Sequence, residues 1–333
     1  MNTFLGILGI IILIGVIIDI LQTTFFLTGV GFITGKISMA IWNLLLRIHK
    51  KTKSDKFLSY AGSSIILFTF FIWALLFLAG LTFFFNFSDY SIINADTKIP
   101  ADFWDKIYYV GFTSTTLGIG DFVAGSNFWE IATIASTITG FFLLTLVITY
   151  LIPLISSVEE KRKLASSVNN IGSTPEKFLS QLKSNENYQN LSSLLISFMD
   201  TINSMTQHHL AYPALHYFHS MEKKTASAPA IAILDEALSM LILCYGDDYK
   251  LKSNMIAPVK DAIDDLLKTL ENSFIGSGQN IPDLPDAEIL RQINKDITDK
   301  MFSDYYESIK QRRKILLTYV ESDGWEWDDV VKS

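Results

Sequence analysis

Three long stretches of the chain carry almost no charged residues. Residues 57–88 and 131–158 carry no charge, and residues 1–35 carry only Asp19. A helix needs about 20 apolar residues to cross the hydrocarbon core of a bilayer. The pattern predicts three membrane-spanning helices, the first over roughly residues 3–27. A signal peptide is the alternative for the first stretch, but this stretch lacks a basic start and a small-residue cleavage motif.

An amphipathic stretch follows the first predicted span. Apolar residues recur at helical spacing within residues 36–56, with polar residues opposite, which is typical of a helix in the membrane interface anchored by Trp42. Clustered basic residues mark the cytoplasmic side. They are Arg47, Lys50, Lys51, Lys53 and Lys56. The predicted topology is a multi-pass protein of the cell (plasma) membrane, with the N-terminus and residues 87–129 outside and the C-terminal domain in the cytoplasm.

Charge divides the chain into two unlike parts. Residues 1–156 hold eight acidic and eight basic side chains, whereas residues 157–333 hold 26 acidic and 19 basic ones and all of the net charge of −7. The first part is typical of a membrane domain and the second of a soluble one. The single Cys244 excludes a disulfide scaffold, and the acidic balance argues against nucleic acid as a partner.

A motif with alternating glycines lies between the second and third predicted spans. Residues 100–113 form an amphipathic segment too short to cross the bilayer, and after them comes the string Thr115-Thr116-Leu117-Gly118-Ile119-Gly120-Asp121. Glycine at alternate positions permits backbone angles that point consecutive carbonyl groups the same way. The string resembles the pore signature of the potassium-channel superfamily, whose core is Thr-Val-Gly-Tyr-Gly-Asp.

The resemblance covers roughly residues 57–156 and implies a selectivity filter in which backbone carbonyls replace the water shell of a permeant K+ ion. We expect the side chains of Leu117 and Ile119 to point away from the pore axis and to pack the filter against the pore helix. The implied ion-binding residues are Thr116, Leu117, Gly118, Ile119 and Gly120. The implied supporting residues are Thr115, Asp121, Phe112, Tyr108 and Tyr109.

Two departures from the family pattern bear on ion selectivity. Ile119 replaces the filter tyrosine and has no hydroxyl to bond to the aromatic pair Tyr108 and Tyr109. Phe112 stands where some members carry a glutamate that pairs with the filter aspartate, so Asp121 lacks that acidic partner. A weakly selective channel for Na+ and K+ is therefore an alternative to a K+-selective one.

Assembly and gating follow from the same resemblance. One pore loop per chain implies a homotetramer, because four loops build one filter. Gly140 lies twenty residues after Gly120, at the family's inner-helix hinge spacing, and Pro153 removes a backbone hydrogen bond near the cytoplasmic end of that helix. Both are gating candidates, with close helix packing as the alternative for Gly140. No arginine ladder recurs in any span, so we do not predict a voltage sensor.

Asp19 is an acidic side chain inside the first predicted span. An ionised carboxylate at the centre of a membrane helix costs ~2.5–3.5 kcal/mol on insertion scales, so we expect Asp19 to face protein or water. We interpret it as a polar staple to a neighbouring helix. A role in the ion path is the alternative.

Residues 157–333 show helical periodicity throughout. Apolar stripes occupy residues 191–205 and 256–270, and a long helix is predicted from Asp286 to about Val320, with Gly324 past its end. A strand followed by a glycine-rich loop is absent from the pattern, so we do not predict a Rossmann-type regulatory domain. The partner predicted for this domain is an unknown ligand or protein.

Four histidines lie close together in this domain, at His208, His209, His216 and His219. His216 and His219 share a helix face if the segment is helical, where they would bind a metal or sense pH near about 6–7. Aromatic packing and helix capping around Pro213 is the interpretation we favour.

The sequence therefore predicts an all-α membrane protein with a pore-loop tetrameric cation channel fold. Its expected parts are an N-terminal transmembrane helix (1–35), an interfacial helix and basic loop (36–56), a pore domain (57–156) and a cytoplasmic helical domain (157–333). The expected function is passive K+ conduction, gated by movement of the inner helix under control of the cytoplasmic domain. A signalling receptor with a vestigial pore is a second alternative. We expect no enzymatic activity and no organic cofactor, and we expect the lipid bilayer and other copies of the chain as partners.

Overall fold

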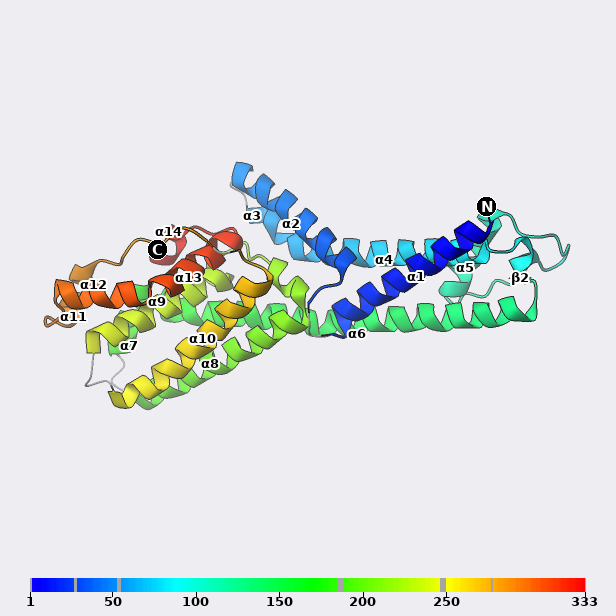
Figure 1. Cartoon of the computed structure of the whole chain (residues 1–333). Coiled ribbons are helices and arrows are strands. Elements are labelled where there is room, and N and C mark those ends of the chain that lie inside the picture. The colour runs from blue at the N-terminus through cyan, green and yellow to red at the C-terminus, as the bar shows by residue number, and fades with distance from the viewer. Residues whose placement is uncertain are drawn as a thin grey trace. The chain divides into compact units, whose positions relative to one another are not determined.

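A computed structural model describes residues 2–26, 29–52, 55–184, 188–245, 250–276 and 278–332. The chain is mostly helical and divides into two compact units (Figure 1). The first unit contains Met1–Ala40 and Ser64–Pro153, and the second contains Ile41–Ser63 and Leu154–Ser333. Three of the described helices continue from one unit into the other: α2 (Phe32–Thr52), α4 (Ala61–Phe85) and α6 (Asn127–Ile171). Lys53 of the predicted basic run lies outside the described residues, as do the side chains of Lys50 and Leu191.

The first unit is built on α1 (Asn2–Thr24), α4 (Ala61–Phe85), the short α5 (Phe103–Ser114) and the first part of α6. A 3-10 turn, η1 (Asp89–Ser91), leads into a two-stranded antiparallel sheet of β1 (Ile92–Asn94) and β2 (Phe122–Ala124). This sheet joins the chain before α5 to the chain after it, so both ends of the loop between α4 and α6 are fixed. Among the described residues, the other regular elements are helices.

Helices α1 and α4 pack antiparallel through glycines. A methyl group on Gly9 would lie 2.6 Å from the carbonyl oxygen of Gly80, and one on Gly80 would lie 2.9 Å from Leu13. Glycine at these two positions therefore allows the helix backbones to approach closely, as in other membrane helix pairs. The apolar core of the unit gathers large side chains of α1, α4, α5 and α6. They include Val16, Ile20, Trp73, Phe77, Phe85, Tyr109 and Trp129.

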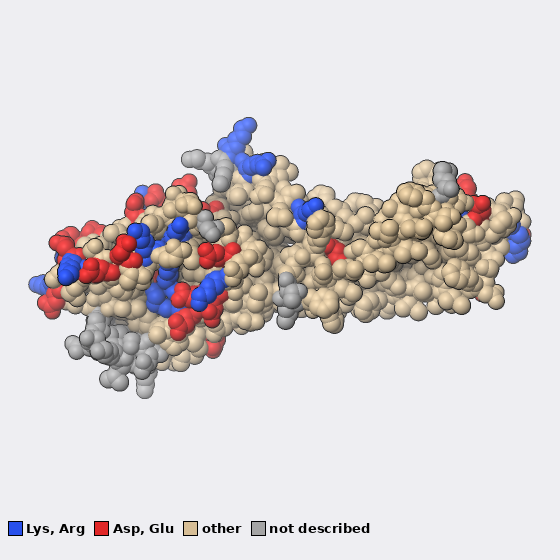
Figure 2. Space-filling view, viewed as in Figure 1, with Lys and Arg blue, Asp and Glu red and all other residues tan. Residues whose placement is uncertain are grey.

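Among the described residues, four helices are long and apolar enough to cross a membrane, namely α1, α4, α6 and α9 (Ser227–Tyr245). The three predicted spans correspond to the first three. The apolar window of α9 is 94% buried inside the protein, whereas those of α1, α4 and α6 are 28%, 39% and 17% buried. The apolar surface of α9 is therefore covered by the protein itself, and the other three leave theirs open to an apolar surrounding. Figure 2 shows charged side chains over the region of α9 to α13 and few over α1, α4 and α6 on the visible face.

The second unit is a helical domain with α9 at its centre. Around it lie α7 (Pro175–Ser184), α8 (Tyr188–Ala211), α10 (Lys250–Ser273) and α13 (Lys310–Ser322). The shorter elements are α3 (Asp55–Ser59), η2 (Pro213–Tyr217), η3 (Lys223–Thr225), α11 (Ala287–Ile293), α12 (Asp299–Ser308) and α14 (Asp328–Val331). The predicted stripes of α8 and α10 are confirmed as core, because Ile202 and Ile263 are completely buried.

The prediction of one long helix from Asp286 to Val320 is wrong. Asp286 does cap a helix, by accepting a hydrogen bond from the backbone of Glu288, but the chain breaks at Asn294 and again at Ile309. The Asn294 amide donates to the carbonyl oxygen of Cys244 at 2.7 Å, and its side-chain oxygen accepts the backbone N–H of Asp296. This side chain therefore satisfies backbone groups of two segments, which competes with a continuous helix.

The second unit corrects the expectation for Trp42 and holds the C-terminal segment of the chain. Trp42 is not an interfacial anchor, because it is buried and packs on His216 and Tyr217 with a ring-centroid distance of 5.5 Å to the latter. The C-terminal segment docks within the chain, since Val330 of α14 is completely buried and Trp325 lies 5.4 Å from the ring of His219. Gly324 follows α13 with a φ of 88°, as expected of a helix-ending glycine.

Candidate functional site

The predicted pore helix is α5, and its start is encoded in the local sequence. The carboxylate of Asp102 accepts the backbone N–H of Asp105 at 2.8 Å, and the carboxylate of Asp105 accepts the N–H of Asp102 at 3.0 Å. This reciprocal capping box fixes the first turn. The helix ends at Ser114, where Thr116 donates its backbone N–H to Thr113 and Leu117 donates to Phe112 at 2.8 Å. The glycine-containing segment is thus anchored directly to the C-terminal turn of α5.

The backbone of this segment alternates in conformation. Thr116, Gly118 and Gly120 have positive φ angles of 61°, 59° and 91°. Glycine adopts this region without a steric cost, whereas a threonine there is strained. The three residues also line one wall of a cavity of about 650 Å³ whose opposite wall is formed by residues of α6. The alternation expected from the two glycines is therefore present and extends to Thr116.

The side chains between these positions are not packed on the pore helix of their own chain. Leu117 is 68% exposed and Ile119 is 51% exposed. The expectation that both pack the filter against the pore helix is therefore not met within a single chain. These two large apolar side chains form an exposed apolar surface on the segment.

Tyr108 and Tyr109, the aromatic pair of the predicted pore helix, contact residues other than Ile119. The Tyr108 hydroxyl lies near the carboxylate of Asp121, the residue that ends the segment, and the two groups interact electrostatically. The Tyr109 hydroxyl lies 2.7 Å from the hydroxyl of Thr133 on α6. The sequence reasoning left Asp121 without a partner because it compared residue types at one position, and it missed both Tyr108 and Thr133 as partners. The sequence signal for the Tyr108 contact was a tyrosine on the face of α5 along which the chain returns.

The two gating candidates lie in different settings on α6. A methyl group on Gly140 would lie 2.9 Å from the carbonyl oxygen of Ser114 and 3.4 Å from the ring of Phe77. Gly140 therefore brings α6 close to the end of the pore helix, as the packing alternative required. Pro153 lies inside α6, which continues without interruption to Ile171, and it is the last residue of the first unit.

Asp19 is buried in the first unit and accepts hydrogen bonds from two elements. Its carboxylate accepts the backbone N–H of Ile33 at 2.7 Å and both the N–H and the hydroxyl of Thr34, the latter at 2.7 Å. It also accepts the indole N–H of Trp73 at 2.9 Å. Negative charge at a helix N-terminus is favourable, so Asp19 caps α2 while it fastens α1 to α4. These are the contacts of a polar staple, and Trp73 is the partner that the sequence reasoning did not name.

Each of the four histidines has its own partner in the fold. His208 lies 3.1 Å from the Glu160 carboxylate, and His209 donates from Nδ1 to the carbonyl oxygen of Met205 at 2.8 Å. His216 stacks on Phe274 at 4.8 Å, and His219 lies 2.7 Å from the carbonyl oxygen of Asp323. Within the described part of the chain, no group of His, Cys, Asp and Glu residues is arranged to hold a metal. The metal hypothesis is therefore wrong for these residues, and the packing interpretation fits them.

The pH-sensor hypothesis fails for two of the four. Burial, and after it nearby Lys161, lowers the pKa of His209 to about 3. Burial also lowers the pKa of His216 well below its usual value, with His209 and Lys161 acting in the same direction. Both imidazoles are neutral near pH 6–7, because an apolar surrounding disfavours the charged form.

These features define a class of protein: an all-α membrane protein with a short capped helix and a strained glycine-containing segment between two apolar helices. The chain is 30% identical over 329 residues to the uncharacterized membrane protein YdjJ of Bacillus subtilis (strain 168), covering 98% of this chain and 96% of that protein. The chain therefore belongs to the YdjJ family of membrane proteins. No family model and no solved structure matches it.

Proposed function

We propose that the chain forms a K+ channel in which four copies each contribute residues 116–120 to one selectivity filter. The observation that carries the proposal is the alternation of positive φ at Thr116, Gly118 and Gly120, in a segment that begins at the C-terminal turn of α5. Alternating backbone angles direct consecutive carbonyl oxygens to one side, where they replace the hydration shell of K+.

The surroundings of the segment suit a cation. The C-terminal end of a helix carries a partial negative charge, and α5 ends at the start of the segment. Thr116 adds a hydroxyl oxygen to the set of carbonyls. Exposed carboxylates of the outer loop, including Asp89, Asp96 and Asp121, raise the local cation concentration. Permeant K+ is the ion that this donor set is proposed to bind.

The exposed side chains support the proposed homotetramer. Leu117 and Ile119 have no cover within one chain, and a cyclic arrangement of identical chains presents each of them to a neighbouring copy. One segment per chain supplies only a quarter of the ligands that surround an ion in a four-fold filter. Assembly is thus proposed both to complete the ion site and to bury these two residues.

A weakly selective Na+/K+ channel is the second candidate, and one observation favours it. The Tyr109 hydroxyl hydrogen-bonds to Thr133 and the Tyr108 hydroxyl lies near Asp121, whereas Ile119 has no hydroxyl. The apolar side chain of Ile119 therefore cannot tie the middle of the segment to the helix by a hydrogen bond. A less rigid ring of carbonyls discriminates less well between ions of different radius.

The test measures ion binding and ion flow with the full-length protein. Calorimetry in detergent records K+ and Na+ binding whether or not a gate is open, and liposomes with opposed K+ and Na+ gradients give the reversal potential. We expect K+ to bind in preference to Na+ and the reversal potential to lie near the K+ equilibrium value. Gly118→Ala, at a φ of 59°, is expected to abolish the preference, because alanine resists that conformation.

The matched control is Gly15→Ala, at an exposed helical position where a methyl group meets nothing within 4 Å. It is expected to behave like the wild type in both measurements. Equal binding of Na+ and K+ with a reversal potential near zero would favour the weakly selective channel. Absence of ion binding in the wild type, with Gly118→Ala indistinguishable from it, would refute both candidates.

A further inference from the structure

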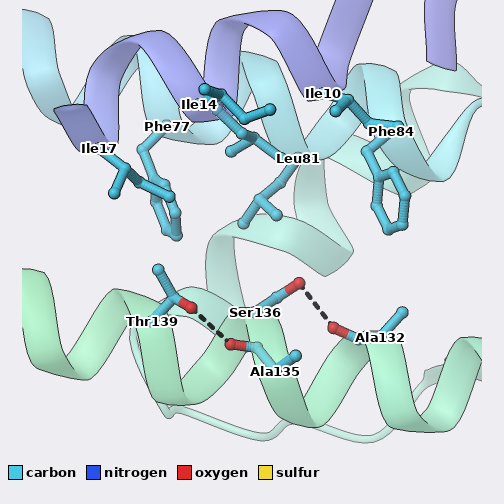
Figure 3. A pocket seen from close by; sticks show the side chains of 11 residues that line it. Ile10, Ile14, Ile17, Phe77, Leu81, Phe84, Ala132, Ala135, Ser136 and Thr139 are labelled. Atoms are coloured by element: carbon cyan, nitrogen blue, oxygen red, sulfur yellow. Dashed lines mark hydrogen bonds between the residues drawn. The ribbon is translucent and has the colours of Figure 1, made fainter. Parts of the chain in front are cut away.

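A cavity of about 230 Å³ lies between α1, α4 and α6 in the first unit (Figure 3). Ile10 and Ile14 of α1 and Phe77 and Phe84 of α4 form one side of it. Small residues of α6 face them from the other side, with Ser136 among them. This cavity is separate from the one beside the glycine-containing segment, and the proposed ion path makes no use of it.

The cavity is closed on three sides by direct contacts. Helix α6 meets α4 at one end through Gly140 and Phe77, and at the other end through Trp129 and Phe84, whose ring centroids lie 5.5 Å apart. Helices α1 and α4 touch through their glycines. The remaining side lies between α1 and α6, where Ile14 is 54% exposed. An occupant therefore enters sideways, between these two helices.

The hydroxyl groups of the lining have no free hydrogen-bond donor to offer. The Ser136 hydroxyl donates to the carbonyl oxygen of Ala132 at 2.7 Å, and the Thr139 hydroxyl donates to that of Ala135 at 2.8 Å (Figure 3). No charged side chain is among the described residues that line the cavity. Water needs two to four polar partners to occupy a buried site, so this cavity favours an apolar occupant.

The volume of the cavity and the helices around it indicate which kind of molecule fits inside. A cavity of about 150 Å³ holds a benzene ring, so one of about 230 Å³ holds a short run of an alkyl chain. A helix, about 10–12 Å across with its side chains, does not enter such a space. All three lining helices are apolar enough to cross a membrane, and the open side faces the surroundings of α1 and α6.

We propose that the acyl chain of a membrane lipid lies in this cavity, between α6 and the α1–α4 pair. The site takes the hydrocarbon tail and not the headgroup, because its polar groups are already bonded. The lipid fills the space that separates α6 from α1 along most of two turns, so it supports the position of α6. This inference needs the three helices to be embedded in a bilayer and is independent of ion conduction.

The test uses full-length protein in liposomes that contain a phosphatidylcholine with a photoactivatable diazirine on its acyl chain. Mass spectrometry then maps the labelled residues. We expect labelling within the α6 segment that contains Ser136 and on Ile14. Phe71, which is 57% exposed on α4, reports ordinary contact with lipid.

The variant is Ser136→Leu, which fills the cavity. It is expected to reduce labelling of Ile14 about tenfold, the ratio that ~1.4 kcal/mol produces, while Phe71 is labelled as before. The matched control is Thr145→Leu, nine residues further on and so on the opposite face of α6, where the hydroxyl also bonds back within the helix.

Labelling of Phe71 without labelling of the cavity in the wild type would overturn the proposal, and so would equal labelling of Ile14 in all three proteins. Crosslinks from cavity residues to a second copy of the chain would show that another subunit is the occupant. If Ser136→Leu fails to fold, competition by unlabelled lipid in the wild type decides: loss of Ile14 labelling at lower competitor concentration than Phe71 labelling indicates a discrete site.

Discussion

The Tyr108 hydroxyl lies near the carboxylate of Asp121 and interacts with it electrostatically. This interaction links the end of the glycine-containing segment to the helix from which the segment starts. The tyrosine ring also packs edge-on against Phe112 and Phe122. The segment is thus held at both ends by α5, through backbone bonds at Thr116 and Leu117 and through a side chain at Asp121.

Tyr108→Phe keeps this ring packing and removes the hydroxyl donor. The Tyr108 side chain is exposed, so solvent weakens its interaction with the Asp121 carboxylate. We expect the rise in thermal stability that K+ confers over Na+ to become smaller in the variant. The matched control is Tyr90→Phe, on the exposed outer loop. An unchanged K+ effect in Tyr108→Phe would show that this contact does not shape the ion site.

Asp19→Asn tests the polar staple. The amide keeps one acceptor oxygen but turns an N–H₂ group toward the donors of Ile33, Thr34 and Trp73, and it removes the negative charge from the N-terminus of α2. We expect a loss of about 1–2 kcal/mol in stability, seen as a lower midpoint of thermal denaturation in detergent. Asp89→Asn, at an exposed carboxylate that contacts Asn2, is the control. Full stability together with altered ion flow would instead favour the role in an ion path.

Arg313→Ala tests the buried ion pair of the second unit. The guanidinium donates to Glu236 at 2.6 Å and to the carbonyl oxygens of Pro282 and Asp283, and both charged side chains are almost fully buried. Removal of one partner leaves a buried uncompensated carboxylate, so we expect a loss of about 3–5 kcal/mol or failure to fold.

The comparison variant for the ion pair is Lys310→Ala, which removes an exposed partner of Glu307. Its expected cost is below about 1 kcal/mol, because solvent screens exposed pairs. Chemical denaturation with helical content as the signal measures both. Equal effects of the two substitutions would contradict the argument from burial.

The pKa of His209, about 3 in the folded chain against an ordinary 6.5, makes stability depend on pH. Below pH 6.5 the unfolded chain binds a proton at this residue that the folded chain does not. The titration of His209 therefore costs no stability above pH 6.5. The free energy of unfolding falls as the pH drops toward 3, by up to ~1.4 kcal/mol per pH unit for one proton. The lowered pKa of His216 acts in the same direction.

His209→Phe removes one of these protons, so we expect a shallower loss of stability between about pH 6 and pH 4, measured as the denaturation midpoint at each pH. The control is Met205→Leu in the same core, which changes packing but not titration. The slope of stability against pH tests the prediction. The stability of His209→Phe at a single pH does not, because the substitution also removes the hydrogen bond to Met205. Parallel pH profiles for wild type and His209→Phe would contradict the prediction.

Local signals in the sequence were sufficient for several features of the molecule. The uncharged lengths around Ile12, Trp73 and Leu143 predicted α1, α4 and the first part of α6, because membrane helices need about 20 apolar residues whatever surrounds them. The pair Gly118 and Gly120 predicted the alternating backbone, since φ preferences belong to the residue itself. The stripes of α8 and α10 identified core residues because helical periodicity is a local property.

Only the tertiary structure decided which side chains meet. Asp19 lies 54 residues from Trp73, and Asn294 lies 50 residues from Cys244, so no local pattern couples either pair. The Asn294 contact stops a helix that the periodicity of residues 287–320 favoured. In the same way, the fold placed His209 and His216 together in an apolar surrounding beside Phe274. Periodicity reports which face of an element is buried, whereas hydrogen bonds and pKa values depend on the segment packed against that face.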